Sequence, residues 1–490
     1  MLYLLILFPL LMAALAFATP SNRVRPWLLP GGGLGQLVLA GVAILGPAPP
    51  ADPGDWLLLD ALGKVVLGFL TVLFFICSLY APAYLALRPD RPNRVFCANL
   101  FAALGMMVLV ILSHHLGLMW VAMEMTTLVS ASTIYFNHNA RSLEATWKYL
   151  LIGSVGIALA LFGSLFLAYS AFSADLDSTL LFDQLIQDAP KLSAPWLHAA
   201  FVLLFVGYGT KMGLAPMHTW KPDAYGEAPG LVGTLLAGGV TSCAFLAILR
   251  VYLICQAGAE AEFARELLIF MGLLSMAVAA VFMVRQRDFK RMLAYSSVEH
   301  MGILVLGVGI GGAALYGALL HLINNGLTKG VLFLSAGNIH RAYGSKRADQ
   351  VRGAIRRVPF SGALFLAGFF AITGAPPFGP FVSEFIIVNA AMSTAQFLVG
   401  GLFLLLLGVI FIGMGSTVLA VVQGNPPEAP LTLQETEEGM ATAPESYRDS
   451  LATCGPILLF MALVTLLGIY VPAPLDALLK DATAFLEAKG

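Results

Sequence analysis

Charged residues are scarce in this chain, and this scarcity fixes its broad class. Only 11% of its 490 residues are Asp, Glu, Lys or Arg, while 59% are hydrophobic. An average soluble domain carries about 25% charged residues. Apolar runs of about twenty residues, the length that crosses a bilayer, recur along almost the whole chain. The sequence therefore predicts an all-α, multi-pass protein embedded in a lipid bilayer, and its formal net charge of −1 gives no basis for nucleic-acid binding.

The cysteine patterns of disulfide frameworks and metal–thiolate clusters are also missing. The chain has five cysteines, an odd number, and they lie far apart with no C-x-x-C pair. This spacing disfavours both kinds of site, and buried, inert thiols are the simplest expectation. We therefore predict no catalytic residue, no cofactor-binding residue and no metal ligand in this chain. Any redox centre must lie in another subunit.

Apolar runs between charged or Pro/Gly breaks divide the chain into about fourteen predicted transmembrane helices. The first run ends in Ala-Phe-Ala, as a signal peptide does, but no Lys or Arg precedes it and many further runs follow, so we expect it to remain as the first helix. The polar segment 423–450 predicts a mobile surface loop, and 473–490 a short interfacial helix. The fourteen predicted ranges are 2–19, 28–47, 64–87, 97–113, 115–134, 149–173, 197–219, 230–255, 265–284, 293–311, 315–338, 359–391, 397–423 and 453–472.

The loop charges alternate along this series. Loops after odd-numbered helices are basic and loops after even-numbered helices are acidic or neutral, except that the loop after helix 13 is acidic and is a candidate docking segment for a partner. By the positive-inside rule, the basic loops are cytoplasmic and both termini face the outer side. The basic residues are Arg23, Arg25, Arg88, Arg91, Arg94, Arg141, Lys148, Lys221, Arg285, Arg287, Lys290, Arg291, Arg341, Lys346, Arg347, Arg352, Arg356 and Arg357, and the acidic ones are Asp52, Asp55, Asp175, Asp177, Asp183, Asp188, Glu260 and Glu262.

Two predicted helices contain unusual breaks, helix 7 at Lys211–Pro216 and helix 12 at Gly374–Pro380. A proline inside a helix removes a backbone donor and frees the carbonyl one turn earlier. In hydrocarbon, such groups are tolerated only beside protein or water. Paired interruptions in two halves of a membrane chain therefore point to a transport site between repeats. The prolines concerned are Pro216, Pro376, Pro377 and Pro380.

The breaks divide the chain into two halves with flanking segments. Sequence identity between the halves is too weak to establish a repeat from the letters alone. The predicted segments are 1–96 (helices 1–3), 97–256 (helices 4–8, the first half), 257–423 (helices 9–13, the second half), 424–452 (the polar loop) and 453–490 (helix 14 and the C-terminal interfacial segment).

Ionisable residues near the middle of the predicted spans are the main functional signal. Glu124 lies in the middle of helix 5, where an unpaired carboxylate costs a few kcal/mol, and Lys211 beside the break of helix 7 is its natural counter-charge. A small change in their separation would change how strongly Lys211 holds its proton. The pair therefore predicts a place where a proton is loaded and released, and a static structural salt bridge is the alternative.

A second polar stripe lies on helix 11. At 100° per residue, His321, Asn325, Thr328 and Lys329 fall on one face and span about 12 Å, which suits a hydrogen-bonded water path. Glu384, just after the break of helix 12, would end this path, or would instead be a helix-end carboxylate facing a loop. His218 faces either the path or the cytoplasmic rim. Glu299 and His300 at the start of helix 10 are as compatible with an interfacial position as with a buried one.

At these residues the chain resembles the antiporter-like subunits of respiratory complex I, Mrp-type cation/proton antiporters and membrane-bound hydrogenases, and it is most similar to component F of hydrogenase-4 and formate hydrogenlyase complexes. The resemblance covers roughly residues 100–390 and implies two inverted five-helix repeats with broken helices 7 and 12. It further implies Glu124 and Lys211 as a coupled pair, His321 and Lys329 on the connecting path, and no cofactor in this subunit. The segments that carry it are Gly117–Leu128, Leu143–Tyr149, Gly209–Trp220, Lys290–Gly302 and Gly374–Phe385.

The sequence departs from the family pattern in the middle of the path, where it lacks ionisable residues that many relatives carry. Ser242 stands where many relatives carry a bridging Lys, and Asn325 where a second His is common. Lys221 and Tyr225 replace a Leu and a His. If the resemblance holds, water must carry more of the relay, or this member pumps poorly.

Three functional hypotheses follow. The first is a non-catalytic, proton-translocating subunit in a prokaryotic inner membrane, beside other membrane subunits and a peripheral iron–sulfur or hydrogenase-like redox arm. The second is a subunit of an Mrp-type Na⁺/H⁺ antiporter, which has no redox partner. The third is a structural membrane anchor with a degenerate proton path, which the substitutions at Ser242 and Asn325 favour.

Overall fold

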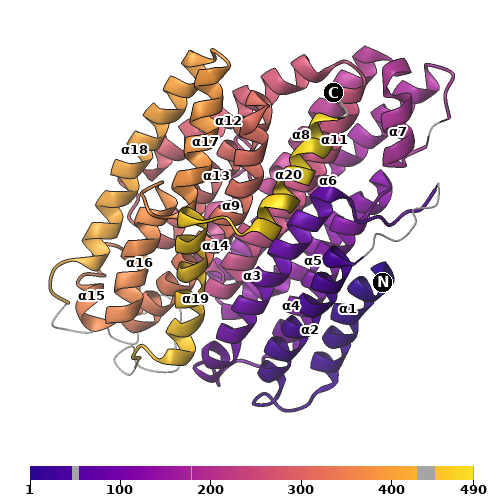
Figure 1. Ribbon diagram of the computed structural model, residues 1–490. Helices are drawn as coiled ribbons and strands as arrows, with labels where there is room; N and C mark the ends of the chain where they lie inside the picture. Colours follow the sequence, from indigo (N-terminus) through magenta and orange to yellow (C-terminus); the bar gives the residue numbers. More distant parts are fainter. Residues whose placement is uncertain (47–53, 178, 427–446, 489–490) are drawn as a thin grey trace.

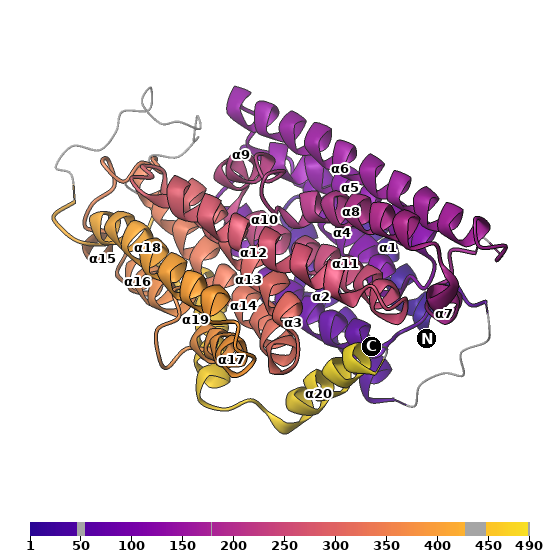
Figure 2. The same ribbon diagram turned by 90° about the horizontal axis from the view of Figure 1, so that it is seen from above.

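The computed structural model describes residues 1–46, 54–177, 179–426 and 447–488, and within these ranges every regular element is a helix. The long helices run side by side as an oblique slab (Figure 1). Seen from above, the N-terminal helices lie toward one end of the slab and α15–α18 toward the other (Figure 2). The predicted polar loop, 423–450, falls mostly outside the described residues.

The helical elements follow the order of the predicted spans. They are α1 (Leu2–Ala18), η1 (Arg25–Trp27), α2 (Leu28–Leu45), α3 (Ala61–Ala86), α4 (Arg94–Leu112), α5 (Leu116–Ile134), η2 (Tyr135–Asn137), α6 (Ala140–Phe172), α7 (Phe182–Asp188), η3 (Ala189–Lys191), α8 (Ala194–Met212), α9 (Trp220–Glu227), α10 (Gly230–Leu235), the π-helical η4 (Leu236–Val240), α11 (Thr241–Ala257), α12 (Ala261–Met283), α13 (Phe289–Ile310), α14 (Ala313–Tyr343), α15 (Ala354–Arg357), α16 (Pro359–Ile372), α17 (Gly379–Ser393), α18 (Phe397–Val422), α19 (Leu451–Ile469) and α20 (Ala473–Glu487).

Each of the fourteen predicted ranges overlaps a helix, and the eighth and twelfth overlap interrupted ones. In the part of the chain that the structure describes, nine helices are long and apolar enough to cross a membrane. The helices α5, α8 and α14 are not among these nine. They carry Glu124, Lys211 and Lys329, and polar residues of this kind lower a helix's mean hydropathy.

The helix α6 begins at Ala140, nine residues before the predicted start, because its first turns are polar. Asn139 accepts a hydrogen bond from the Ser142 amide (2.7 Å), and the Ser142 hydroxyl accepts one from the Asn139 amide (3.1 Å). This reciprocal pair is a capping box, which satisfies donors at a helix start. Arg141 and Lys148, predicted as loop charges, therefore lie on the helix itself.

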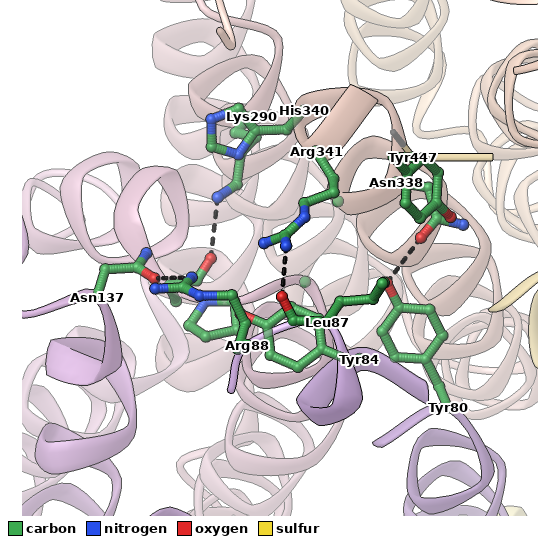
Figure 3. A pocket seen from close by; sticks show the side chains of 14 residues that line it. Tyr80, Tyr84, Leu87, Arg88, Asn137, Lys290, Asn338, His340, Arg341 and Tyr447 are labelled. Atoms are coloured by element: carbon green, nitrogen blue, oxygen red, sulfur yellow. Dashed lines mark hydrogen bonds between the residues drawn. The ribbon is translucent and has the colours of Figure 1, made fainter. Parts of the chain in front are cut away.

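The loops gather on two opposite faces of the slab, where the helices begin and end, because consecutive helices cross it in opposite directions. Each of these faces is called an end below. At one end, Arg88, Asn137, Pro229, Lys290 and Arg341 line a small cavity of about 30 Å³ (Figure 3). These residues belong to the loops or helix ends that follow predicted helices 3, 5, 7, 9 and 11. At the other end, Asp60, His114 and Asp183, which follow predicted helices 2, 4 and 6, line a separate pocket together with Arg250 of predicted helix 8.

Several residues predicted as loop cations are buried. Arg25 donates from Nε to the Ala16 carbonyl (2.9 Å), and Lys290 donates from Nζ to the Ala228 carbonyl (2.9 Å). Lys346 pairs with Glu227 at 2.5 Å. Lys221, also predicted in a loop, lies on α9 and is fully buried. Hydropathy places such residues at the ends of spans, but it does not show that the loops fold back and use the cations to satisfy helix-end carbonyls.

The two predicted halves pack their helices in the same pairwise order. In the first half, α4 packs on α5, α5 on α6, α6 on α8, and α8 on α11. In the second half, α12 packs on α13, α13 on α14, α14 on α16 and α17, and these two on α18. The C-terminal α20 lies outside this series, against α3 and α14 (Figure 1).

Arg250 on α11 joins the start of α3 to the end of α4. Its guanidinium donates to Asp60 Oδ2 at 3.1 and 3.0 Å and to the Ile111, Val110 and Ser113 carbonyls at the end of α4. Both side chains of the ion pair are buried, with relative exposures of 3% and 10%. One side chain therefore satisfies a carboxylate and a helix end at once.

We expect Arg250→Met to lower the free energy of unfolding by about 3–5 kcal/mol, because it leaves a buried carboxylate unpaired. Denaturant unfolding in detergent, followed by tryptophan fluorescence, measures this loss. Lys480→Met is the control, since it breaks the exposed Lys480–Asp476 pair and should cost under about 1 kcal/mol. Equal losses in the two variants would contradict a stabilising role for Arg250.

Candidate functional site

The first helix break is held open by side chains that replace the lost helical hydrogen bonds. The helix α8 ends at Met212, and Gly213 adopts a φ of +84°, which favours glycine. Trp220 Nε1 donates to the Thr210 carbonyl (2.9 Å), and Lys221 Nζ donates to the Met212 carbonyl (2.7 Å). The break therefore exposes few backbone groups that would need lipid or water as a partner.

The Lys211 side chain, in the last turn of α8, reaches Glu124 through a hydroxyl. Lys211 is 1% exposed, and its Nζ donates to Thr127 Oγ1 on α5. The Thr127 hydroxyl in turn donates to Glu124 Oε2 (3.3 Å), and Glu124 Oε1 accepts from Ser154 on α6 (2.8 Å). Among the described residues, Glu124 and Lys211 form no direct ion pair. The predicted pair is thus brought together with Thr127 between its members, and these four residues are called the first cluster below.

Two residues of α6 shape the space around the Lys211 ammonium. The Tyr149 ring centroid lies 5.3 Å from Lys211 Nζ, a cation–π distance. A Cβ at Gly153 would lie 3.2 Å from the same nitrogen, so the missing side chain leaves room for the ammonium. The sequence analysis included neither residue in the site.

A second cluster lies where α13, α14 and α17 meet. Lys329 on α14 is fully buried, and its Nζ donates to Ser296 Oγ on α13 (2.8 Å). One turn further along α13, His300 Nδ1 lies 2.9 Å from His321 Nε2 on α14. His321 Nδ1 then lies 2.9 Å from Ser383 Oγ on α17. Buried side chains therefore connect three helices.

Glu299 and His300 lie inside this cluster rather than at an interface. Their relative exposures are 2% and 0%, and Glu299 Oε2 lies 3.8 Å from His300 Nε2. Sequence reasoning left their position open because they follow the basic start of α13 by only two turns. The run of Tyr295 to His300, with two serines followed by two ionisable residues on a buried helix, was the available signal.

Glu384 completes the second cluster beside the second helix break. It lies in the second turn of α17, is 5% exposed, and its carboxylate sits against Gly374, which adopts a φ of +70°. One ligand atom each of Glu384, His300 and His321 lie within 4.8 Å of one another. The second cluster therefore comprises Lys329, Ser296, Glu299, His300, His321, Ser383 and Glu384.

Asn324 fixes the second break, a role that sequence reasoning missed. Its Nδ2 donates to the Gly379 carbonyl (2.8 Å) and to Ser383 Oγ (3.3 Å). It thereby ties α14 to the first turn of α17. Asn324 stands next to the predicted Asn325, and the sequence gives no signal that distinguishes a structural asparagine from one on the proton path.

Three predicted path residues do not join the two hydrogen-bonded clusters. The Thr328 hydroxyl donates to the Asn324 carbonyl of its own helix (2.7 Å). Asn325 is 2% exposed, and its Oδ1 has no hydrogen-bond partner among the described residues. The His218 imidazole packs beside the rings of Phe282 and Tyr295, with centroids 6.4 and 6.2 Å away.

Lys221 lies between the two clusters. Its helix, α9, packs against α6 of the first half and α13 of the second. Its Nζ reaches the carbonyl of Met212, the residue next to Lys211, and lies 5.7 Å from the Tyr225 ring centroid. By contrast, the Ser242 hydroxyl on α11 donates to the Gly238 carbonyl of the preceding turn (2.5 Å). The buried cation between the halves is therefore Lys221, in a place where sequence reasoning expected a loop.

Known proteins share both the sequence and the fold. The family model described as "NADH:quinone oxidoreductase/Mrp antiporter, TM" matches residues 113–414, which contain both clusters and both breaks. A hydrogenase-4 component F homolog from Methylacidiphilum infernorum is 34% identical over 85% of this chain and 88% of its own. An NADH-quinone oxidoreductase subunit N from Desulforudis audaxviator is 30% identical over 69% of this chain and 67% of its own.

A solved structure extends this similarity to the fold. A chain of the Mrp complex from Dietzia sp. superimposes with a TM-score of 0.86, at 19% identity, and covers 100% of this chain and 98% of its own. The all-helical fold and the resemblance inferred from the five motif segments are thus confirmed. The chain belongs to the antiporter-like family of membrane subunits that NADH:quinone oxidoreductases and Mrp antiporters share.

Proposed function

We propose that this chain carries protons across a membrane, as an antiporter-like subunit of a redox-driven complex of the hydrogenase-4 or complex I type. The observation that supports this proposal most directly is a pair of hydrogen-bonded clusters whose lysines, Lys211 and Lys329, are buried, with the buried Lys221 between the two clusters. Ionisable residues inside a membrane protein are costly and mark ion paths. Family membership supports the same function, since homologues are subunits of membrane complexes.

The chemistry of the cluster residues suits proton transfer rather than metal-ion conduction alone. Hydroxyl and imidazole groups both donate and accept hydrogen bonds, so a proton can enter on one side of the group and leave on the other. In the second cluster, His300, His321 and Ser383 stand in a hydrogen-bonded series, and Ser296, which accepts from Lys329, lies one turn before His300 on the same helix. Between the clusters, where the described side chains leave gaps, water carries the proton.

The first cluster supplies the switch in this proposal. Two unit charges 4 Å apart attract by about 4 kcal/mol at an effective dielectric constant near 20. Thr127 stands between Lys211 and Glu124, so a small shift of α5 against α8 changes the separation of the two charges and thereby how tightly Lys211 holds its proton. Because α8 ends one residue after Lys211, the break gives this turn a place to move.

The surroundings of the subunit follow from the same proposal. The chain would carry no cofactor and would lie beside other membrane subunits and a peripheral iron–sulfur or hydrogenase-like redox arm. We place it in a prokaryotic inner membrane with both termini outside, since the positive-inside rule puts the basic end of the slab in the cytoplasm. The two five-helix halves would be inverted repeats.

An Mrp-type Na⁺/H⁺ antiporter subunit is the second candidate function, and it is favoured by the high TM-score to a chain of an Mrp complex. The neighbouring genes distinguish the two. Hydrogenase-like or iron–sulfur subunits would support the redox-driven complex, and a set of small antiporter subunits would support the Mrp class.

We expect Lys211→Ala and Glu124→Gln each to reduce proton translocation by more than about tenfold, the effect of a barrier raised by ~1.4 kcal/mol. Pumping is measured with a pH-sensitive dye in proteoliposomes that contain the whole complex. Thr127→Val keeps the shape of the side chain but removes the bridging hydroxyl, so it should give an intermediate loss. Lys480→Ala, on the exposed face of α20, is the control. Normal pumping in both charge variants of an assembled complex would leave only the structural-anchor function.

Lys221→Leu restores the residue that relatives carry while removing the cation between the clusters. We expect it to slow proton translocation by about tenfold or more, and Lys221→Arg to retain more activity than Lys221→Leu because it keeps a positive charge. The Lys221→Leu, Ser242→Lys double variant places a lysine at the relatives' bridging position and should recover part of the loss. A Lys221→Leu complex that assembles and pumps normally would show that Lys221 only caps α8.

A further inference from the structure

We propose that His300, His321 and Glu384 form a binding site for a transition-metal cation such as Zn²⁺, and that a metal ion bound there inhibits the subunit. The three residues come from α13, α14 and α17, and one ligand atom of each lies within 4.8 Å of the other two. The binding part stands on this geometry alone. The inhibitory part rests on the proposed function, because it requires the second cluster to carry protons.

The three donors form a set that zinc commonly uses. Two imidazole nitrogens and one carboxylate oxygen are the protein ligands of many zinc sites, and a water or fourth side chain completes the tetrahedron. Zinc–nitrogen bonds of about 2.0–2.1 Å place neighbouring ligand atoms roughly 3.3 Å apart. The glutamate donor therefore needs to approach each imidazole nitrogen by at most about 1.5 Å, while the two imidazole nitrogens, now 2.9 Å apart, need to separate slightly.

One candidate donor atom has no competing protein partner. Glu384 Oε1 is buried, and it accepts no hydrogen bond among the described residues. A buried carboxylate oxygen without a partner pays the full cost of desolvation. A bound cation would remove that cost, and Glu299, 3.8 Å from His300, would add a second negative charge nearby.

The shell around the donors already orients them. Ser383 Oγ lies 2.9 Å from His321 Nδ1, which leaves Nε2 directed toward the other two donors. Metal-ligating histidines are usually held through their second nitrogen in this way. Ser383 is itself fixed by Asn324, whose Nδ2 lies 3.3 Å from it. The site is therefore supported by residues on two of the three helices that supply ligands.

Metal binding would block the second cluster in two ways. It would occupy the imidazole nitrogens that pass the proton between His300 and His321. It would also cross-link α13, α14 and α17, and so prevent the second break from moving. Zn²⁺ should therefore stop proton translocation without displacing any substrate or cofactor.

Equilibrium dialysis of the purified full-length chain against Zn²⁺, after treatment with a chelator, tests binding independently of pumping. We expect one tight site in the wild type, and about tenfold or weaker binding in His321→Ala and Glu384→Gln. His198→Asn is the matched control, because His198 pairs with Glu260 at 2.7 Å in the other half of the chain. If binding is unchanged in His321→Ala and Glu384→Gln, or lost in His198→Asn, the bound Zn²⁺ is adventitious and the proposed site is refuted.

Co²⁺ gives a second readout that needs no variant. Four-coordinate Co²⁺ absorbs visible light far more strongly than six-coordinate, water-bound Co²⁺, so an intense band that Zn²⁺ abolishes is expected. A weak octahedral spectrum would contradict the proposed ligands even if a variant failed to fold.

Proteoliposome assays separate this inference from the proposed function. Zn²⁺ should inhibit proton translocation in the wild type and in His198→Asn over the concentration range in which it binds. If Zn²⁺ binds as expected but pumping is unaffected, the metal site stands and the proton path does not pass through His300 and His321. If Zn²⁺ inhibits pumping without binding to these residues, the path stands and the metal site is refuted.

Discussion

The structure depends on one constraint, which is that the backbone polar groups inside the bilayer must find partners within the protein. The two helix breaks are where this constraint acts most strongly. At the first, Trp220 and Lys221 satisfy the carbonyls of the last turn of α8. At the second, Asn324 satisfies the Gly379 carbonyl. Each break thereby holds an ionisable residue close to irregular backbone, Lys211 in the last turn of α8 and Glu384 in the second turn of α17.

The two halves stabilise a buried lysine in the same way. In each, the ammonium donates to a hydroxyl that stands one helical turn from a glutamate: Lys211 to Thr127, beside Glu124, and Lys329 to Ser296, beside Glu299. Residues three apart on a helix share a face, so the hydroxyl and the carboxylate lie on the same side of α5 or α13. A neutral group between the charges keeps them close, yet leaves the proton free to move.

The long elements could be predicted from the sequence because membrane helices are apolar runs of about twenty residues. Each of the fourteen apolar runs overlaps a helix of the structure, and the loops between them line pockets at opposite ends of the helices. The start of α6 was wrong because a polar helix end looks like a loop in hydropathy. The position of Lys221 was wrong for a related reason: a cation near the end of an apolar run usually faces water, and only the fold shows that α9 turns back between α6 and α13.

The site was predicted less completely, because hydrophobicity singles out charges but not their intermediaries. Glu124, Lys211, His321, Lys329 and Glu384 stand out in apolar surroundings. Thr127, Ser154, Ser296 and Ser383 do not, since serine and threonine are common in membrane helices, where they bond to their own backbone. The Thr328 hydroxyl donates to a carbonyl of its own helix, whereas the Thr127 and Ser154 hydroxyls donate to the Glu124 carboxylate. The distinction depends on which neighbouring helix lies opposite, and one sequence does not encode that visibly.

Lys221 also bears on whether the path is degenerate. Read from the sequence, Ser242 removes a bridging cation and favours a structural anchor. In the fold, the chain retains a fully buried cation between its halves, on α9 instead of α11. A buried lysine that served only to cap α8 could be replaced by an uncharged donor at a lower cost of desolvation. The retention of the charge is therefore better explained by a path that still needs a protonatable group at this point than by an anchor that does not.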